Sequence, residues 1–117
     1  MGRRRYRKGP RHQYSPDVVA YRVLSDEKLY RVCEIVFTSS DLIHATDVSK
    51  KLGISVGYAY LLLKKLEKWR VVVGVRDPVN GKLAFKVGIG KAAELVGEEI
   101  KKRRAKELEN VIIRPQL

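Results

Sequence analysis

Apolar residues recur along the first half of the chain at intervals of three and four, the spacing of helices with one buried face. In residues 25–37 this spacing predicts a helix that buries Leu29, Val32, Cys33 and Val36. Residues 15–17 read Ser-Pro-Asp, a typical helix start, whereas Val18, Val19 and Tyr21 favour extended structure. Residues 16–23 are therefore either a short helix or an extended stretch.

Two closely spaced helices follow, separated by a sharp bend. Thr46 and Ser55 can each cap a helix start, because a side-chain oxygen accepts a backbone N–H that lacks a partner in the first turn. The first helix, residues 47–52, turns Val48 and Leu52 inward. Gly53 after it allows a left-handed backbone, and residue 54, an isoleucine, is expected in the core that both helices share.

The second helix has an apolar and a polar side. Successive residues advance by 100°, which places on one inner face Ala59, Leu62, Leu63, Leu66 and Trp69. The opposite, outward face carries Gly57, Tyr60, Leu61, Lys64 and Lys68, with Tyr58 and Lys65 on its flank.

Short β-forming segments lie on both sides of this helix pair. Residues 42–45 are apolar and consistent with a small strand. Residues 71–76 and 83–87 alternate as two strands do, and Asn80-Gly81 between them favours a hairpin, because this dipeptide accepts positive φ angles. The sequence therefore predicts a β-hairpin after the helix pair.

Residues 91–110 predict a last helix, whose apolar stripe includes Ala92, Ala93, Leu95, Val96 and Ile100. Residues 101–106, Lys-Lys-Arg-Arg-Ala-Lys, interrupt this stripe before it resumes at Leu108 and residues 111–113. The stripe is too broken for a long coiled coil. One interpretation is a helix packed back on its own domain with a basic, solvated face.

The order helix, turn, helix and hairpin in residues 24–89 resembles the winged helix-turn-helix family, above all its small archaeal and bacterial transcriptional regulators. The resemblance implies an α+β fold with a three-helix core, a β-hairpin wing and an additional C-terminal helix. It also implies a homodimer joined through the helix after the wing. The expected division is a disordered basic arm at 1–15, a winged-helix domain at 16–90, and a C-terminal helix and tail at 91–117.

Charge narrows the choice of partner. The chain has 25 Lys and Arg against 13 Asp and Glu, a net charge of +12, which favours DNA, RNA or an acidic membrane surface as partner. No apolar run approaches the roughly 20 residues that span a membrane, and no segment resembles a cleaved signal. We therefore expect a cytoplasmic protein. Abundant Lys, Arg and Glu beside few Asn, Gln, Cys and Met is typical of a thermophile.

Catalytic and metal chemistry have little support. Cys33 is the only cysteine, which excludes an intramolecular disulfide and a thiolate zinc cluster, and its position predicts a buried, inert thiol. His12 and His44 lie in different segments with no nearby carboxylate cluster at ligand spacing, and both are interpreted as ordinary surface or turn residues. Residues 88–91, Gly-Ile-Gly-Lys, lack the full phosphate-loop pattern and are interpreted as a linker. We expect no enzyme activity and no cofactor.

Double-stranded DNA is the expected partner. The first 15 residues hold arginines and tyrosines without an acid, a composition that is disordered alone but can enter a minor groove; a solubilising tail is the alternative. The candidate DNA-binding residues of the arm are Arg3, Arg4, Arg5 and Arg7. Those of the outward helix are Ser55, Gly57, Tyr58, Tyr60, Lys64, Lys65 and Lys68. Those of the wing are Arg76, Lys82 and Lys86.

The outward helix face departs from the family pattern. DNA readers usually place Arg, Ser, Thr, Gln or Asn where this chain has Val56, Gly57, Tyr60 and Leu61. We therefore expect largely phosphate-directed, sequence-tolerant binding, in which Leu61 or Val56 can touch thymine methyl groups. The alternative function keeps the fold and changes the partner: a protein-interaction or RNA-binding module within a larger assembly.

Overall fold

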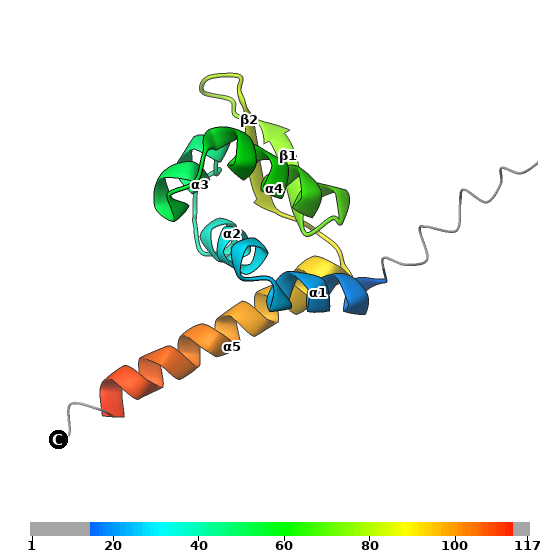
Figure 1. Ribbon diagram of the computed structural model, residues 1–117. Coiled ribbons are helices and arrows are strands. Elements are labelled where there is room, and N and C mark those ends of the chain that lie inside the picture. The colour runs from blue at the N-terminus through cyan, green and yellow to red at the C-terminus, as the bar shows by residue number, and fades with distance from the viewer. Residues whose placement is uncertain (1–14, 114–117) are drawn as a thin grey trace, which may run out of the picture.

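The computed structural model describes residues 15–113, and side chains as far as residue 110; the arm arginines and the last four residues lie outside this range. Five helices and a two-stranded antiparallel sheet follow one another along the chain (Figure 1). Their bounds are α1 Pro16–Ser25, α2 Glu27–Phe37, α3 Ala45–Leu52, α4 Val56–Lys68, β1 Val72–Arg76, β2 Leu83–Val87 and α5 Lys91–Ile113. The hairpin and α4 occupy the end of the molecule away from α1 and α5 (Figure 1).

The first segment is a helix rather than an extended stretch. Ser15 caps α1 by accepting the N–H of Val18 at 3.4 Å, and a proline occupies the first turn. Val19, Ala20 and Val23 are buried, and α1 packs on α5. Burial of this face outweighs the β propensity of its valines, because tertiary packing contributes more than intrinsic preference does.

The bend between α3 and α4 is confirmed, with a correction at the start of α3. Gly53 is left-handed at a φ of 69°, and Ser55 caps α4 by accepting the N–H of Tyr58 at 3.1 Å. The predicted cap at Thr46 is wrong, because α3 begins earlier and His44 is its N-cap. The Asp47 carboxylate accepts the His44 N–H at 2.8 Å, which fixes the earlier start.

The wing is a hairpin whose connecting loop lies between the two predicted strands. In the register of the two strands Val72 pairs with Val87 and Arg76 with Leu83. Asn80-Gly81 lies in a loop over residues 77–82, and of these two residues only Gly81 has a positive φ, 74°. The side chains of Asp77 and Asn80 stabilise this loop by accepting the backbone N–H groups of Val79 and Lys82, each at 2.9 Å.

The predicted small strand is reduced to one bridge. Ile43 and Phe85 exchange two backbone hydrogen bonds, of 3.0 and 2.8 Å, so the segment before α3 is attached to β2 at a single residue. This bridge ties the wing to the helix pair.

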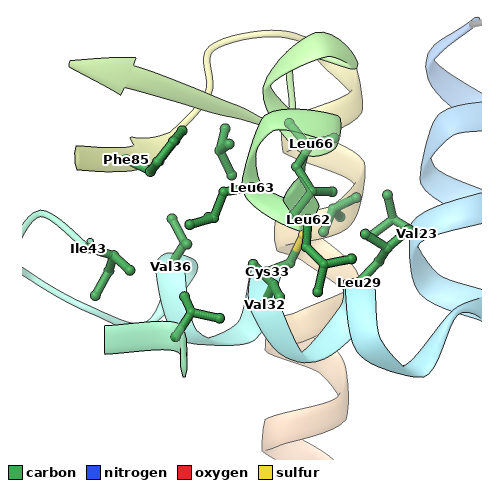
Figure 2. Close-up of a cluster of buried hydrophobic side chains, with 14 of the residues drawn as sticks. Val23, Leu29, Val32, Cys33, Val36, Ile43, Leu62, Leu63, Leu66 and Phe85 are labelled. Carbon is green, nitrogen blue, oxygen red and sulfur yellow. The ribbon is translucent and has the colours of Figure 1, made fainter. Parts of the chain in front are cut away.

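The core lies between α2, α4 and the wing. Figure 2 shows Leu62, Leu63 and Leu66 of α4 directed toward α2, with Phe85 of β2 beside them. Cys33 is fully buried among these side chains, and burial raises the pKa of its thiol far above the ordinary value. The inert, buried cysteine predicted from the sequence is confirmed.

Helix α5 has two unlike halves. Its first half buries Ala92, Ala93, Val96 and Ile100, and it packs against α1. Residues 101–110 are all exposed, and the helix extends away from the body (Figure 1). The guanidinium of Arg103 lies 4.6 Å from the ring centroid of Tyr30 in α2, and that of Arg104 lies 3.8 Å from the carboxylate of Glu34. The packing of α5 on its own domain thus applies to its first half.

The end of α4 holds a strained residue that provides a first prediction. Arg70 has a φ of 66°, and its N–H and that of Val71 bond to the carbonyls of Glu67 and Leu66, both at 2.9 Å. Glycine is the usual residue at this position of a helix end. We expect Arg70→Gly to raise the free energy of unfolding by roughly 0.5–1 kcal/mol, since relief of strain exceeds the entropy cost of glycine.

Chemical denaturation of the purified variants measures this gain. Arg70→Ala is the matched control, because it removes the same side chain and keeps the left-handed strain. Equal stability of the glycine and alanine variants would contradict the prediction.

Candidate nucleic-acid interface

The outward face of α4 is set by the burial of its inner face. Ala59, Leu63 and Leu66 have no exposed surface, so the helix cannot rotate without opening the core. Leu61 on the other side is 64% exposed, and Val56, Tyr58 and Tyr60 are exposed as well. The face identified from the sequence is therefore the accessible one.

The first turn of α4 leaves room for close approach of a ligand. Ser55 and Gly57 are both exposed, and a Cβ added to Gly57 would meet nothing within 4 Å. The hydroxyl of Ser55 is engaged with the N–H of Tyr58 at 3.1 Å. Ser55 thus shapes the helix start, where the positive end of the helix dipole lies.

The three lysines of α4 differ in their surroundings. The Nζ of Lys64 lies 2.7 Å from Glu67 Oε1, and this hydrogen bond is the main cause that raises the pKa of Lys64. Lys65 lies over the ring of Trp69, 5.4 Å from its centroid. Lys68 is exposed. The charge of Lys64 is partly neutralised within the helix, so Lys65 and Lys68 are better candidates than Lys64 for contact with an anion.

Glu67 also contacts the wing. A Cβ on Gly74 of β1 would lie 2.8 Å from Glu67 Oε2, so the hairpin packs closely on the end of α4 at this glycine. The sequence analysis missed Glu67, although its spacing of three residues from Lys64 is that of a helical ion pair. An acid on this face weakens attraction for a polyanion.

The cations of the wing do not form one cluster. The strand register places Arg76 opposite Leu83 and Lys86 opposite Val73, so these two exposed cations point to opposite faces of the hairpin. The Nη1 of Arg76 donates to the carbonyl of Gly81 at 3.2 Å. Lys82 lines a hollow of about 290 Å³ together with Thr46 at the start of α3. Lys82 is therefore the wing cation nearest the helix pair.

His44 connects the start of α3 to the base of the wing. Its Nε2 lies 3.0 Å from Asp77 Oδ2, an ion-pair distance without hydrogen-bond geometry, and its Nδ1 lies 3.5 Å from Asp47. The half-buried ring is thus more than the surface or turn residue that the sequence suggested. No group of three or more His, Cys, Asp or Glu within residues 15–113 is placed to hold a metal ion.

The remaining candidates fall outside these contacts. The arm residues Arg3, Arg4, Arg5 and Arg7 lie outside the described residues. Thr46, exposed beside Lys82, was predicted as a cap; because α3 starts two residues earlier, it is a surface hydroxyl next to the wing.

Comparisons with known proteins identify the fold. No protein-family model matches the chain, and no curated protein matches it in sequence. The homodimeric winged helix-turn-helix DNA-binding domain of Mb0332 from Mycobacterium bovis superposes at a TM-score of 0.61 with 13% identity, over 95% of this chain and 94% of that one.

Two longer proteins match as well. The adhesin competence repressor of Streptococcus pyogenes has a TM-score of 0.59 and 21% identity, over 76% of this chain and 63% of that one. A MarR family protein from Bacillus stearothermophilus has a TM-score of 0.53 and 19% identity, over 72% and 57%. This chain therefore spans less than two thirds of the length of either protein.

The chain has a winged helix-turn-helix fold, the fold of MarR- and ArsR-type transcriptional regulators. Of these structural neighbours, the Streptococcus pyogenes protein is a repressor. Among the described residues, no helix is long and apolar enough to cross a membrane.

The ion pair of Lys64 with Glu67 yields a prediction about charge at this face. We expect Glu67→Gln to strengthen binding to duplex DNA, because it removes an acid and releases Lys64 for a phosphate. The slope of log affinity against log salt should steepen by about 0.9, the value of one added phosphate contact.

Fluorescence titration of a labelled duplex at several salt concentrations measures both quantities. Glu98→Gln in α5 is the control, since it removes the same charge at an exposed site away from α4. A Glu67→Gln variant with unchanged affinity and slope would show that Lys64 does not reach the duplex.

Proposed function

We propose that this protein is a DNA-binding transcriptional regulator whose contacts go largely to phosphates. The observation that carries this proposal is the outward face of α4, which the core holds exposed between Ser55 and the lysines of its second half. In such a complex α4 enters the major groove and the wing lies along the backbone.

Charge supports duplex DNA as the partner. The net charge of +12 supplies long-range attraction, and Lys65, Lys68 and Lys82 are the described cations best placed for phosphates. Tyr58 and Tyr60 are exposed and can donate their hydroxyls to phosphates beside them. The arm at residues 1–15 adds a second attachment in a neighbouring minor groove.

The protein-interaction or RNA-binding alternative has one observation in its favour. Leu61 is the most exposed large apolar residue of α4, as an anchor for another protein would be. On that alternative, Leu61→Ala dissociates an assembly while loss of Lys65 and Lys68 leaves it intact.

We further propose a homodimer formed through α5. Its second half is exposed, and Leu108 is 60% exposed on a helix that extends beyond the body. The Mb0332 domain, which has the same fold, is homodimeric. In this arrangement the winged-helix domain, residues 16–90, binds DNA, and residues 91–117 join two copies.

Substitution within the exposed half of α5 tests the dimer. We expect Leu108→Glu to shift the protein from dimer to monomer in sedimentation, because two buried carboxylates would face each other across the interface. Lys106→Glu is the control, since two residues along a helix place the same carboxylate on the opposite side. A wild-type protein that sediments as a monomer would refute the dimer.

The salt dependence of binding tests the nucleic-acid proposal. With about six phosphate contacts, log affinity should fall against log salt with a slope near −5 on duplex DNA. Titrations on duplex RNA and on single strands, under matched salt, identify the preferred polyanion. A slope near zero, or no binding at low salt, would refute the nucleic-acid proposal and favour a protein partner for the exposed face of α4.

Removal of residues 1–14 in the same assay separates the arm from the domain. The truncated protein should lose about 1–3 kcal/mol of binding energy with a shallower slope, because several phosphate contacts disappear. Its melting temperature should not change. Equal binding by the truncated protein would make the arm a solubilising tail.

A further inference from the structure

We propose that Leu61 reads the C5-methyl groups of pyrimidines in the major groove, which makes thymine, or 5-methylcytosine, the preferred base beneath α4. This inference rests on the proposed function and names the base feature that the face recognises. It concerns specificity, whereas the cations supply affinity.

Leu61 lies at the centre of the outward face. Its side chain is 64% exposed, and one turn earlier Gly57 has no side chain, with nothing within 4 Å of the Cβ it lacks. Lys64 and Lys68 follow one and two turns later on the same face. Leu61 is therefore an exposed apolar group with open space at Gly57 on its N-terminal side and with lysines on its C-terminal side.

The chemistry of the face leaves few ways to distinguish bases. Hydrogen-bonding side chains read most base edges, but Leu61 cannot form such bonds, and Lys64 is already bonded to Glu67 at 2.7 Å. Each base pair shows a distinct pattern in the major groove, and the methyl group of thymine is its apolar element. Apolar contact with that methyl is the readout available to a leucine.

The surroundings of Leu61 favour DNA over a protein surface. Lys65 and Lys68 are exposed close to it, so a protein that covered Leu61 would also cover these ammonium groups. The buried centres of protein interfaces are depleted in lysine. A DNA groove instead presents apolar methyl groups between two rows of phosphates, which matches an apolar centre flanked by cations.

Two duplexes that differ only in methyl groups test this inference. An alternating A·T duplex presents a thymine methyl at every base pair, and the same duplex with uracil keeps all phosphates and hydrogen-bonding groups. Burial of one methyl contributes about 0.8 kcal/mol, so the wild-type protein should bind the thymine duplex about fourfold more tightly for each methyl contacted. A G·C duplex with 5-methylcytosine should likewise gain affinity over its unmethylated form.

Variants assign the effect to a residue. In Leu61→Ala, the ratio of affinities for the thymine and uracil duplexes should fall close to one. Lys65→Ala is the matched control from the same helix, because loss of a phosphate contact weakens binding to both duplexes and leaves their ratio unchanged. Circular dichroism confirms that the exposed substitutions leave the fold intact.

The outcomes separate the two proposals. Absence of binding to either duplex at low salt refutes the proposed function itself. Equal affinity of the wild-type protein for both duplexes, with normal salt dependence, refutes methyl recognition alone. A preference that persists in Leu61→Ala assigns the readout to another residue and overturns the role of Leu61.

Discussion

The packing of α4 against α2 and the wing is the constraint on which the rest of the structure depends. Leu62, Leu63 and Leu66 are buried against a helix on one side and Phe85 on the other (Figure 2). Truncation of a buried leucine typically costs about 2–5 kcal/mol, so this contact fixes both the position and the rotation of α4. The same packing determines which residues of α4 are exposed, so the exposed residues need not contribute to the stability of the fold.

The wing is held to the same unit at several points. Ile43 pairs with Phe85, His44 lies beside Asp77, and a Cβ at Gly88 would approach the Arg70 carbonyl oxygen to 2.5 Å. A glycine at position 88 allows β2 to leave the sheet against the end of α4. The hairpin and α4 are therefore fixed relative to each other, as a surface that meets one rigid ligand at two places requires.

Local sequence patterns predicted most of the fold, because the elements they describe are stabilised locally. The helix pair was predictable from Gly53 and Ser55, which act within a few residues of themselves. The helical state of α1 was not predictable, since it depends on α5, which lies some 70 residues later in the chain. The wing loop, by contrast, was predictable from local signals, and the side chains of Asp77 and Asn80 stabilise it by accepting backbone N–H groups two residues further on.

The candidate site was predictable in position and less so in charge. The 100° spacing of α4 identified its exposed face. The same spacing does not show whether Lys64 pairs with Glu67 or is left unpaired in solvent. The opposite directions of Arg76 and Lys86 follow from the pairing of the two strands. The structure was therefore needed to determine the surroundings of each cation, whereas the sequence alone identified the exposed face.

The second half of α5 has consequences for local stability. Arg104 makes an ion pair with Glu34 of α2, and residues 105–110 beyond it are exposed. A helical segment of this length has little stability in water by itself, because propagation from the packed half is its main support. In the monomer, the free energy of local opening that exposes its backbone amides to hydrogen exchange should be a small fraction of the free energy of global unfolding. In the homodimer proposed above, this segment would pack against its counterpart, so the stability of the second half of α5 would depend on the association of two chains.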